Sequence, residues 1–382
     1  MPAMLGFVPN AFAYLLVCLH CDSRKKLQAL IAMLLLVCLF VIARGSIDLR
    51  RVVSEGSTVQ SGMGDSTPQE SAGPYLLIMT NDAGELFYRL RGQGVINDPN
   101  DFGQLLVCVI PLVFIFWRPK KSIANLAFVM LPAGGLLYGI YLTHSRGALV
   151  ALMAVIVVAA RRRIGTIPAV LAGGGVFAAA MALHFTGGRE ISAGSGSDRT
   201  SLWSDSLQLV KSHPIFGVGY GNLPDYLGHT AHNSVAVCVA ELGIVGLFFW
   251  AMFLFLTARD VIALASSEKV TDAETVASQE ARFPYAKVNI ELWSKEQINQ
   301  LGRLMLLSLT GFLVAGWFLS RSFVVTLFLL GGIVEVAYEL ALRRGMIGPR
   351  LPVRRVLGYS FCFALSLILL LYVMLRITNL MH

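Results

Sequence analysis

The sequence predicts an all-α membrane protein, a polytopic bundle of about ten transmembrane helices with a large external loop that carries short amphipathic helices. Of the 382 residues, 55% are hydrophobic and only 14% are charged, whereas a soluble domain carries roughly 25% charged residues. The apolar residues form runs of about 15 to 25, close to the length that a helix needs to cross the hydrocarbon core. Because these runs are too long and too apolar for barrel strands, helices are favoured.

Basic clusters set the orientation of these helices, because Lys and Arg gather in loops retained on the inner side of a membrane. Compact clusters occur at residues 22–26, 118–121, 161–163 and 343–355. With these inside, residues 44–100 and 187–232 are external, and the first of these loops is expected to be irregular for much of its length. The predicted helices cover residues 4–20, 27–43, 102–117, 123–142, 148–160, 164–186, 233–257, 303–319, 323–342 and 356–377.

Four parts follow from this topology. They are a hairpin with the first external loop (1–101), a catalytic transmembrane core with its main loop at 187–232 (102–257), an inner insertion (258–302) and the last helices (303–382). The insertion has mixed charge and no catalytic constellation. The net charge of +8 reflects the inner loops, so we predict contact with membrane lipid and no nucleic-acid partner.

The cysteines predict neither disulfides nor a metal site. All six lie in or next to apolar runs, and none falls in the two long external loops, so no disulfide framework is indicated. Cys18, His20 and Cys21 have a ligand-like spacing, but no second cluster of ligands accompanies them. We therefore expect no metal and no cofactor.

A polar motif precedes the helix predicted at 102–117. Arg91 lies in Arg-Leu-Arg-Gly, and Asn100 lies in Asn-Asp-Pro-Asn-Asp. Asn and Asp cap helix starts by accepting hydrogen bonds from unpaired backbone amides. The motif is either a well-made cap or the polar lip of a cavity, and the second reading makes Arg91 and Asn100 candidates for substrate binding.

Arg146 follows the next predicted helix, in Thr-His-Ser-Arg-Gly. The apolar run after it, 148–160, is short, so Arg146 sits at or slightly below the external surface. Two interpretations stay open. The side chain either snorkels to the lipid headgroups, or it faces a water-filled cavity and binds an anion.

The main external loop holds Arg199 at the start of a segment whose apolar residues suit a short amphipathic helix along the membrane. Farther on, the stretch from Gly217 to Gly221 looks like a phosphate-binding glycine loop. No strand precedes it and no Lys-Ser/Thr follows, so we interpret it as a flexible turn and predict no nucleotide partner.

His232 stands where the helix 233–257 begins, in Thr-Ala-His-Asn-Ser. Such a histidine is commonly a structural group, but the helix dipole here favours neutral imidazole and therefore a base. Arg146 and Arg199 on the same outer rim are cations suited to a phosphate-like group. A base beside an anion clamp is a layout for moving a sugar off a pyrophosphate. Glu241, within the helix, is expected to hydrogen bond another helix, with proton coupling as the alternative.

Together, these motifs resemble the O-antigen ligase and O-antigen polymerase superfamily over residues 88–258. To the motifs above, the resemblance adds Trp203, the run from His213 to Asn222, and Glu241-Leu-Gly. It implies a metal-independent, inverting glycosyltransferase that uses an undecaprenyl-pyrophosphate-linked glycan at the periplasmic face of the bacterial inner membrane. It also implies that His232 activates the acceptor and that Arg146 and Arg199 contact the pyrophosphate. Arg321, at another outer helix end, is a weaker candidate of the same kind.

The acceptor distinguishes the readings within this superfamily. A ligase transfers the glycan to lipid A core, a polymerase transfers it to another lipid-linked repeat, and a related enzyme transfers it to protein. No single residue decides among them, and we favour the ligase. A polysaccharide or lipid transporter is the alternative of a different class, and it would show internal repeats with interrupted helices.

Overall fold

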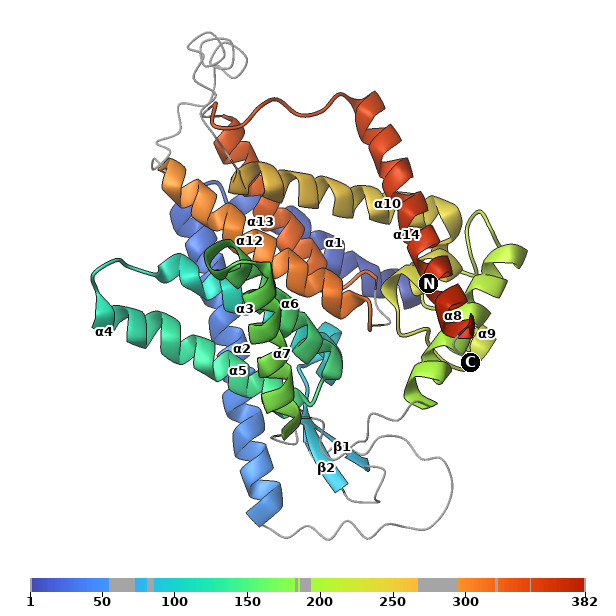
Figure 1. Cartoon of the computed structure of the whole chain (residues 1–382), viewed down its shortest axis with the longest axis horizontal. Coiled ribbons are helices and arrows are strands. Elements are labelled where there is room, and N and C mark those ends of the chain that lie inside the picture. Colours follow the sequence, from blue (N-terminus) through green and yellow to red (C-terminus); the bar gives the residue numbers. More distant parts are fainter. Residues whose placement is uncertain are drawn as a thin grey trace. The chain divides into compact units, whose positions relative to one another are not determined.

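A computed structural model describes residues 2–54, 73–80, 86–182, 185, 194–266, 294–319, 322–343 and 345–380. Within them the chain is mostly helical, and its strands form one two-stranded sheet (Figure 1). Seven of the described helices are long and apolar enough to cross a membrane, and shorter apolar helices cover Gly6–His20 and Thr166–Ala180. The predicted fold class, an all-α polytopic bundle, is confirmed.

The chain forms two compact units. Unit 1 contains Met1–Ala29, Ser192–Leu309 and Gly316–His382, and unit 2 contains Leu30–Ile191 and Thr310–Ala315. The chain passes between them within α2 (Arg24–Ser54), between 191 and 192, and twice within α12 (Lys295–Gly316).

Unit 2 is built around α3, which is buried along most of its length. Its other elements are β1 (Leu76–Thr80), β2 (Leu86–Leu90), η1 (Gly94–Ile96), η2 (Phe114–Phe116), α4 (Ser122–Asn125), the π-helical η3 (Leu126–Met130), α5 (Leu131–Thr143), α6 (Arg146–Ile164) and α7 (Thr166–Ala182). Helix α3 (Pro99–Val113) begins three residues before the predicted start at 102, with a cap in the polar motif. The Asp98 side chain accepts hydrogen bonds from the amides of Asn100 and Asp101, and Pro99 occupies the first turn.

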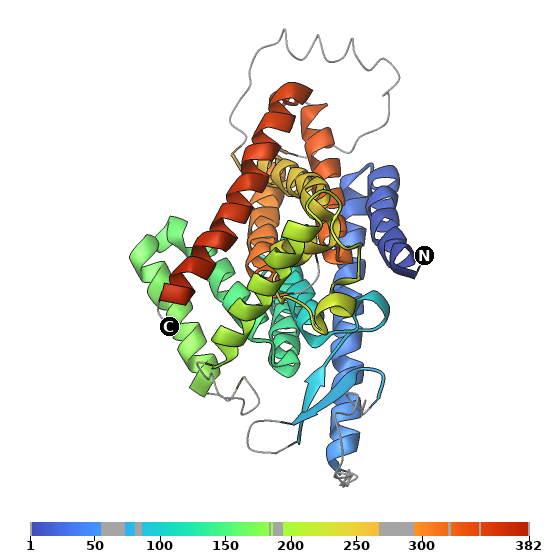
Figure 2. The ribbon, with the colours of Figure 1, turned by 90° about the vertical axis from the view of Figure 1, so that its right-hand side faces the viewer.

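The first external loop differs from the prediction. Helix α2 continues to Ser54, and residues 76–80 pair with residues 86–90 as antiparallel strands, with Leu76 opposite Leu90; residues 55–72 and 81–85 of the predicted loop lie outside the described part of the chain. The hairpin lies along the later part of α2 (Figures 1 and 2), where a Cβ on Gly45 would meet the Leu90 side chain at 2.1 Å. The β-rich Leu-Phe-Tyr-Arg-Leu segment therefore buries its apolar residues against a helix.

Unit 1 packs α10 (Ser234–Ala265) against α13 (Val325–Leu342) and α14 (Val353–Leu380), with α1 (Pro2–His20) also on α13. Small residues allow close contact: Gly331 lies against the Phe253 ring, and Gly332 lies against Val17. The expected helices of the main loop are present as α8 (Gly194–Ser212) and α9 (Leu223–Leu227). Of the predicted insertion, residues 267–293 lie outside the described part of the chain.

Helix α10 is broken at Gly243, whose φ is 65°. The backbone of the preceding loop fills the break. The amides of Val218 and Gly219 donate to the carbonyls of Ala240 and Glu241 at 3.0 and 2.8 Å. In return, the amides of 244 and 245 donate to the carbonyls of 214 and 215 at 2.9 and 3.2 Å.

The glycine run of this loop is therefore a packed segment, which corrects its interpretation as a flexible turn. A Cβ on Gly217 would lie 2.5 Å from the Ala240 carbonyl oxygen. Glycine permits this approach because it has no side chain. The buried carboxylate of Glu241 accepts hydrogen bonds from the amides of Gly221 and Leu223, so it holds the start of α9.

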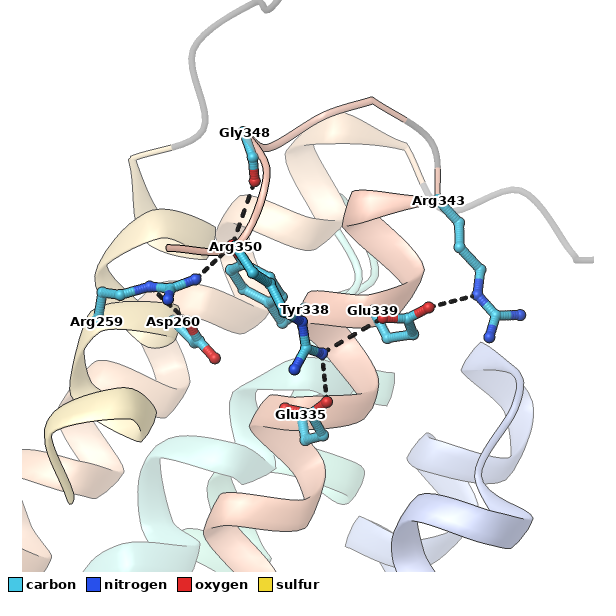
Figure 3. Close-up of polar contacts among 8 residues, drawn as sticks. All are labelled: Arg259, Asp260, Glu335, Tyr338, Glu339, Arg343, Gly348 and Arg350. Atoms are coloured by element: carbon cyan, nitrogen blue, oxygen red, sulfur yellow. Dashed lines mark hydrogen bonds and ion pairs between the residues drawn. The ribbon is translucent and has the colours of Figure 1, made fainter. Parts of the chain in front are cut away.

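A charged cluster closes the C-terminal end of α13 (Figure 3). Arg350 pairs with Glu335 and, at 3.4 Å, with Glu339. Arg259 of α10 donates to the Tyr338 hydroxyl at 2.6 Å, and its guanidinium lies over the Tyr338 ring. These contacts fasten the segment after α13 onto α10 and α13.

Candidate active site

Arg146 is the first residue of a capped helix in unit 2. Helix α5 ends at Thr143, and His144 turns the backbone into the left-handed region with φ of 46°. Ser145 then caps α6, its hydroxyl oxygen accepting from the Ala148 amide at 3.3 Å. Arg146 is half-buried there. The unpaired amides and positive dipole end of a helix N-terminus favour an anion, so the guanidinium and the helix act in the same direction.

The turn between α5 and α6 is fixed by side chains. The Thr143 hydroxyl donates to the Ile140 carbonyl at 2.7 Å and accepts from the Ser145 amide at 3.3 Å. His144 Nδ1 lies 2.6 Å from a carbonyl oxygen, that of Phe185. The His144 ring also contacts three aromatic rings, those of Phe87, Tyr141 and Phe185. Arg146 therefore starts from a backbone with little freedom.

Arg89 connects Asn100 to the α5–α6 turn by hydrogen bonds to both. The Arg89 side chain is buried, with 5% of its surface exposed. Its Nη2 donates to Asn100 Oδ1 at 2.8 Å, and its Nε donates to the Thr143 carbonyl at 2.8 Å. The structure thus joins the motif of Asn100 to the motif of Arg146.

Arg91 makes different contacts. Its amide donates to the Tyr75 carbonyl at 2.9 Å, and its Nη2 lies 3.5 Å from the Gly73 carbonyl. These contacts tie Arg91 to the chain just before β1, so Arg91 and Arg89 anchor different segments.

His232 of unit 1 is exposed and lies just outside a helix cap. Its φ is 46°, a left-handed conformation that histidine adopts more readily than most residues. The cap is the next residue, Asn233, whose side chain accepts from the amides of Val235 and Ala236 at 2.9 and 3.1 Å. His232 therefore precedes α10 rather than forming its first turn.

The start of α10 is bonded to the segment between α12 and α13. Asn233 Nδ2 donates to the Trp317 carbonyl at 3.2 Å. The Ser234 hydroxyl donates to the Leu319 carbonyl at 3.1 Å, and the Ser322 hydroxyl donates to the Ser234 carbonyl at 2.6 Å. The backbone beside His232 is thus held by a second segment of unit 1.

One further candidate lies on a helix of unit 1. Arg199 lies on α8, one turn before Trp203, whose ring packs edge-on against the Trp317 ring at 6.3 Å. The Arg199 side chain lies outside the described part of the structure, as does residue Arg321. Unit 1 thus gathers the segments of His232 and Arg199, whereas Arg91, Asn100 and Arg146 belong to unit 2.

Arg89, Asn233 and Trp317 had no role assigned from the sequence. Arg89 had two signals, its place as the first arginine of the Arg-Leu-Arg-Gly motif and its charge within an otherwise apolar run. Among the described residues, no three His, Cys, Asp or Glu side chains gather as metal ligands.

A protein-family model matches a region that includes the motif of Arg146 and the motif of His232. The family model described as O-antigen ligase matches residues 131–251, less than half of the chain. The match contains Arg146, Arg199 and His232. No curated protein matches the chain. The resemblance to the O-antigen ligase superfamily is confirmed over the matched residues.

Proposed function

Because residues 131–251 match the O-antigen ligase family, whose members are ligases or polymerases of glycosyltransferase type, we propose that the chain transfers a glycan from undecaprenyl pyrophosphate to a hydroxyl of lipid A core. The reaction takes place at the periplasmic face of the bacterial inner membrane. It inverts the configuration of the transferred sugar and needs no metal.

In the proposed step, the acceptor oxygen attacks the anomeric carbon from the face opposite the pyrophosphate. A carbon–oxygen bond forms there while the bond from the anomeric carbon to the pyrophosphate oxygen breaks. His232 takes the acceptor proton, and undecaprenyl pyrophosphate leaves with the bonding electron pair. Arg146, Arg199 and Arg321 offset the charge that grows on the leaving group. Arg91 and Asn100 are further candidates for contacts with the donor.

One observation carries the proposal: the matched region holds both an exposed histidine beside a helix cap and an arginine at a helix N-terminus. An exposed imidazole can reach an external acceptor. The α6 N-terminus adds its own field to the Arg146 guanidinium.

The test is glycan transfer by purified protein in nanodiscs, with undecaprenyl-pyrophosphate oligosaccharide as donor and a metal chelator present. We expect wild type to form product and His232→Ala to lose it. His229→Ala is the matched control, because His229 is an exposed histidine three residues earlier in the same loop. Equal losses in both variants, or full activity of His232→Ala, would refute the role of His232.

The acceptor is tested in the same assay with and without lipid A core. Product that forms only with core supports the ligase. Product ladders without core establish the polymerase, which shares the donor and the chemistry. Product that forms only when the chelator is omitted would contradict the metal-independent step.

The break in α10 is the feature that favours a transporter, because interrupted helices often bind substrates and ions in such proteins. Here the carbonyls of Ala240 and Glu241 already accept hydrogen bonds from the loop. The break is thus filled by protein backbone, and the ligase reading is preferred. Donor-lipid movement across vesicles without glycan transfer would reverse this preference.

A further inference from the structure

We propose that Arg89 is a positioning residue for the transfer reaction. Its buried guanidinium holds the α5–α6 turn, and with it Arg146, against the start of α3. The proposal rests on the proposed function, in which Arg146 binds the donor pyrophosphate. Arg89 itself does not touch substrate.

Burial makes the Arg89 contacts consequential. A buried charge is costly unless its donors are hydrogen bonded. Arg89 meets this requirement in three directions: Nε to the Thr143 carbonyl at 2.8 Å, Nη2 to Asn100 Oδ1 at 2.8 Å, and Nη1 to Met79 Sδ at 3.6 Å. A planar guanidinium can make this set of contacts, whereas a lysine ammonium has neither the fork nor the reach.

A displacement of either hydrogen-bond partner of Arg89, the Thr143 carbonyl or Asn100, would shift Arg146. The Thr143 carbonyl ends α5, and a cation there also favours the negative end of the helix dipole. Asn100 is the second residue of α3, two positions after its Asp98 cap. Arg146 is only three residues beyond Thr143, so the guanidinium fixes the base of the turn that presents Arg146.

Two further observations show which elements surround Arg89. Arg89 is held in β2 by its register opposite Leu77. On the other side, α3 approaches the turn closely, since a Cβ on Gly103 would lie 2.9 Å from Ala148 Cβ and 3.2 Å from Thr143 Oγ1. Hairpin, α3 and turn thus meet around one guanidinium, all within unit 2.

The test is a double-mutant cycle between Arg89 and Arg146. We expect Arg89→Met to lower kcat/KM for the donor by about 10- to 100-fold, as small displacements of a catalytic group do. Because Arg89 acts through Arg146, the variant Arg89→Met/Arg146→Met should be no slower than Arg146→Met alone. Losses that multiply would overturn the proposal.

Arg89→Lys keeps the charge and guards against a variant that does not fold. It should retain part of the activity, while full wild-type activity would overturn the need for the guanidinium. Arg162→Lys is the matched control, an exposed arginine at the far end of α6. It should leave transfer unchanged, and a loss equal to that of Arg89→Lys would overturn a specific role for Arg89.

Hydrogen exchange separates this proposal from the proposed function. In Arg89→Lys, the amides of residues 145–149 should exchange faster, while those of 235–240 in unit 1 stay as in wild type. Unchanged exchange at 145–149 overturns the proposal, whatever the activity. A wild type that transfers no glycan refutes the proposed function, and exchange then decides alone whether Arg89 holds the turn.

Discussion

Two turns in this protein have the same backbone plan and different surroundings. In each, a histidine with φ of 46° precedes a capping residue and a long helix: His144 and Ser145 before α6, His232 and Asn233 before α10. His144 is half-buried among aromatic rings and contacts the Phe185 carbonyl, whereas His232 is exposed. The comparison shows that local sequence sets the turn, and that tertiary packing decides which histidine is accessible for chemistry.

The largest expected effect is at His232. His232→Gln keeps a polar side chain but removes the base, so transfer should fall by about 10²- to 10⁴-fold. The melting temperature should fall only slightly, because the side chain is exposed and the cost is that of placing glutamine in the left-handed backbone conformation. Initial rates and thermal unfolding in the same detergent measure both. Wild-type rates in this variant would show that His232, like His144, is not needed as a base.

Arg146 comes next in expected effect. Arg146→Ala removes one cation from the proposed leaving-group site, so kcat/KM should fall by about 10²- to 10³-fold, as for other lost charge-stabilising groups. Arg146→Lys should lose less, because a point charge remains without the bidentate fork. Steady-state kinetics against donor concentration measure the ranking. A lysine variant slower than the alanine variant would contradict an electrostatic role.

His144 should show the opposite profile to His232. His144→Ala leaves the Phe185 carbonyl without its ring partner and removes packing with three aromatic rings. We expect the unfolding free energy to drop by about 1–3 kcal/mol, with a smaller loss of rate per folded molecule than in His232→Gln, because the Arg89 contacts still hold the α5–α6 turn. Thermal unfolding alongside active-site titration separates the two. Loss of rate with full stability would mark His144 as functional.

The two caps should give the smallest effects. Ser145→Ala and Asn233→Ala should each lower stability by about 1 kcal/mol, the usual cost of losing a cap. Asn233 should cost more, because it accepts from two amides and also donates to the Trp317 carbonyl. Chemical denaturation of the two variants side by side gives the order. Equal losses would show that the Trp317 contact adds nothing.

Much of the fold was predictable because it depends on local sequence. The apolar runs located the helices, and the Asn-Asp-Pro-Asn-Asp motif indicated the cap of α3, since caps and membrane spans are read within a few residues. The hairpin was missed because its apolar residues are stabilised by α2, more than thirty residues away in the chain.

The candidate site was predictable only as a set of residues. His232 and Arg146 stood out by residue type and position, but the exposure of His232 and the contacts of Arg89 depend on segments distant in sequence. The glycine run was misjudged for the same reason. Its conformation is set by the carbonyls of a helix that begins more than ten residues later.

The break in α10 also has a consequence for how the chain is made. A helix entering lipid normally carries all its backbone hydrogen bonds with it, because lipid supplies none. At Gly243, four of these groups are bonded by residues 214–219. The ribosome synthesises residues 214–219 before α10, so the groups that bond the break are already present when α10 emerges. The order of synthesis thus matches the order in which the broken span needs its bonds.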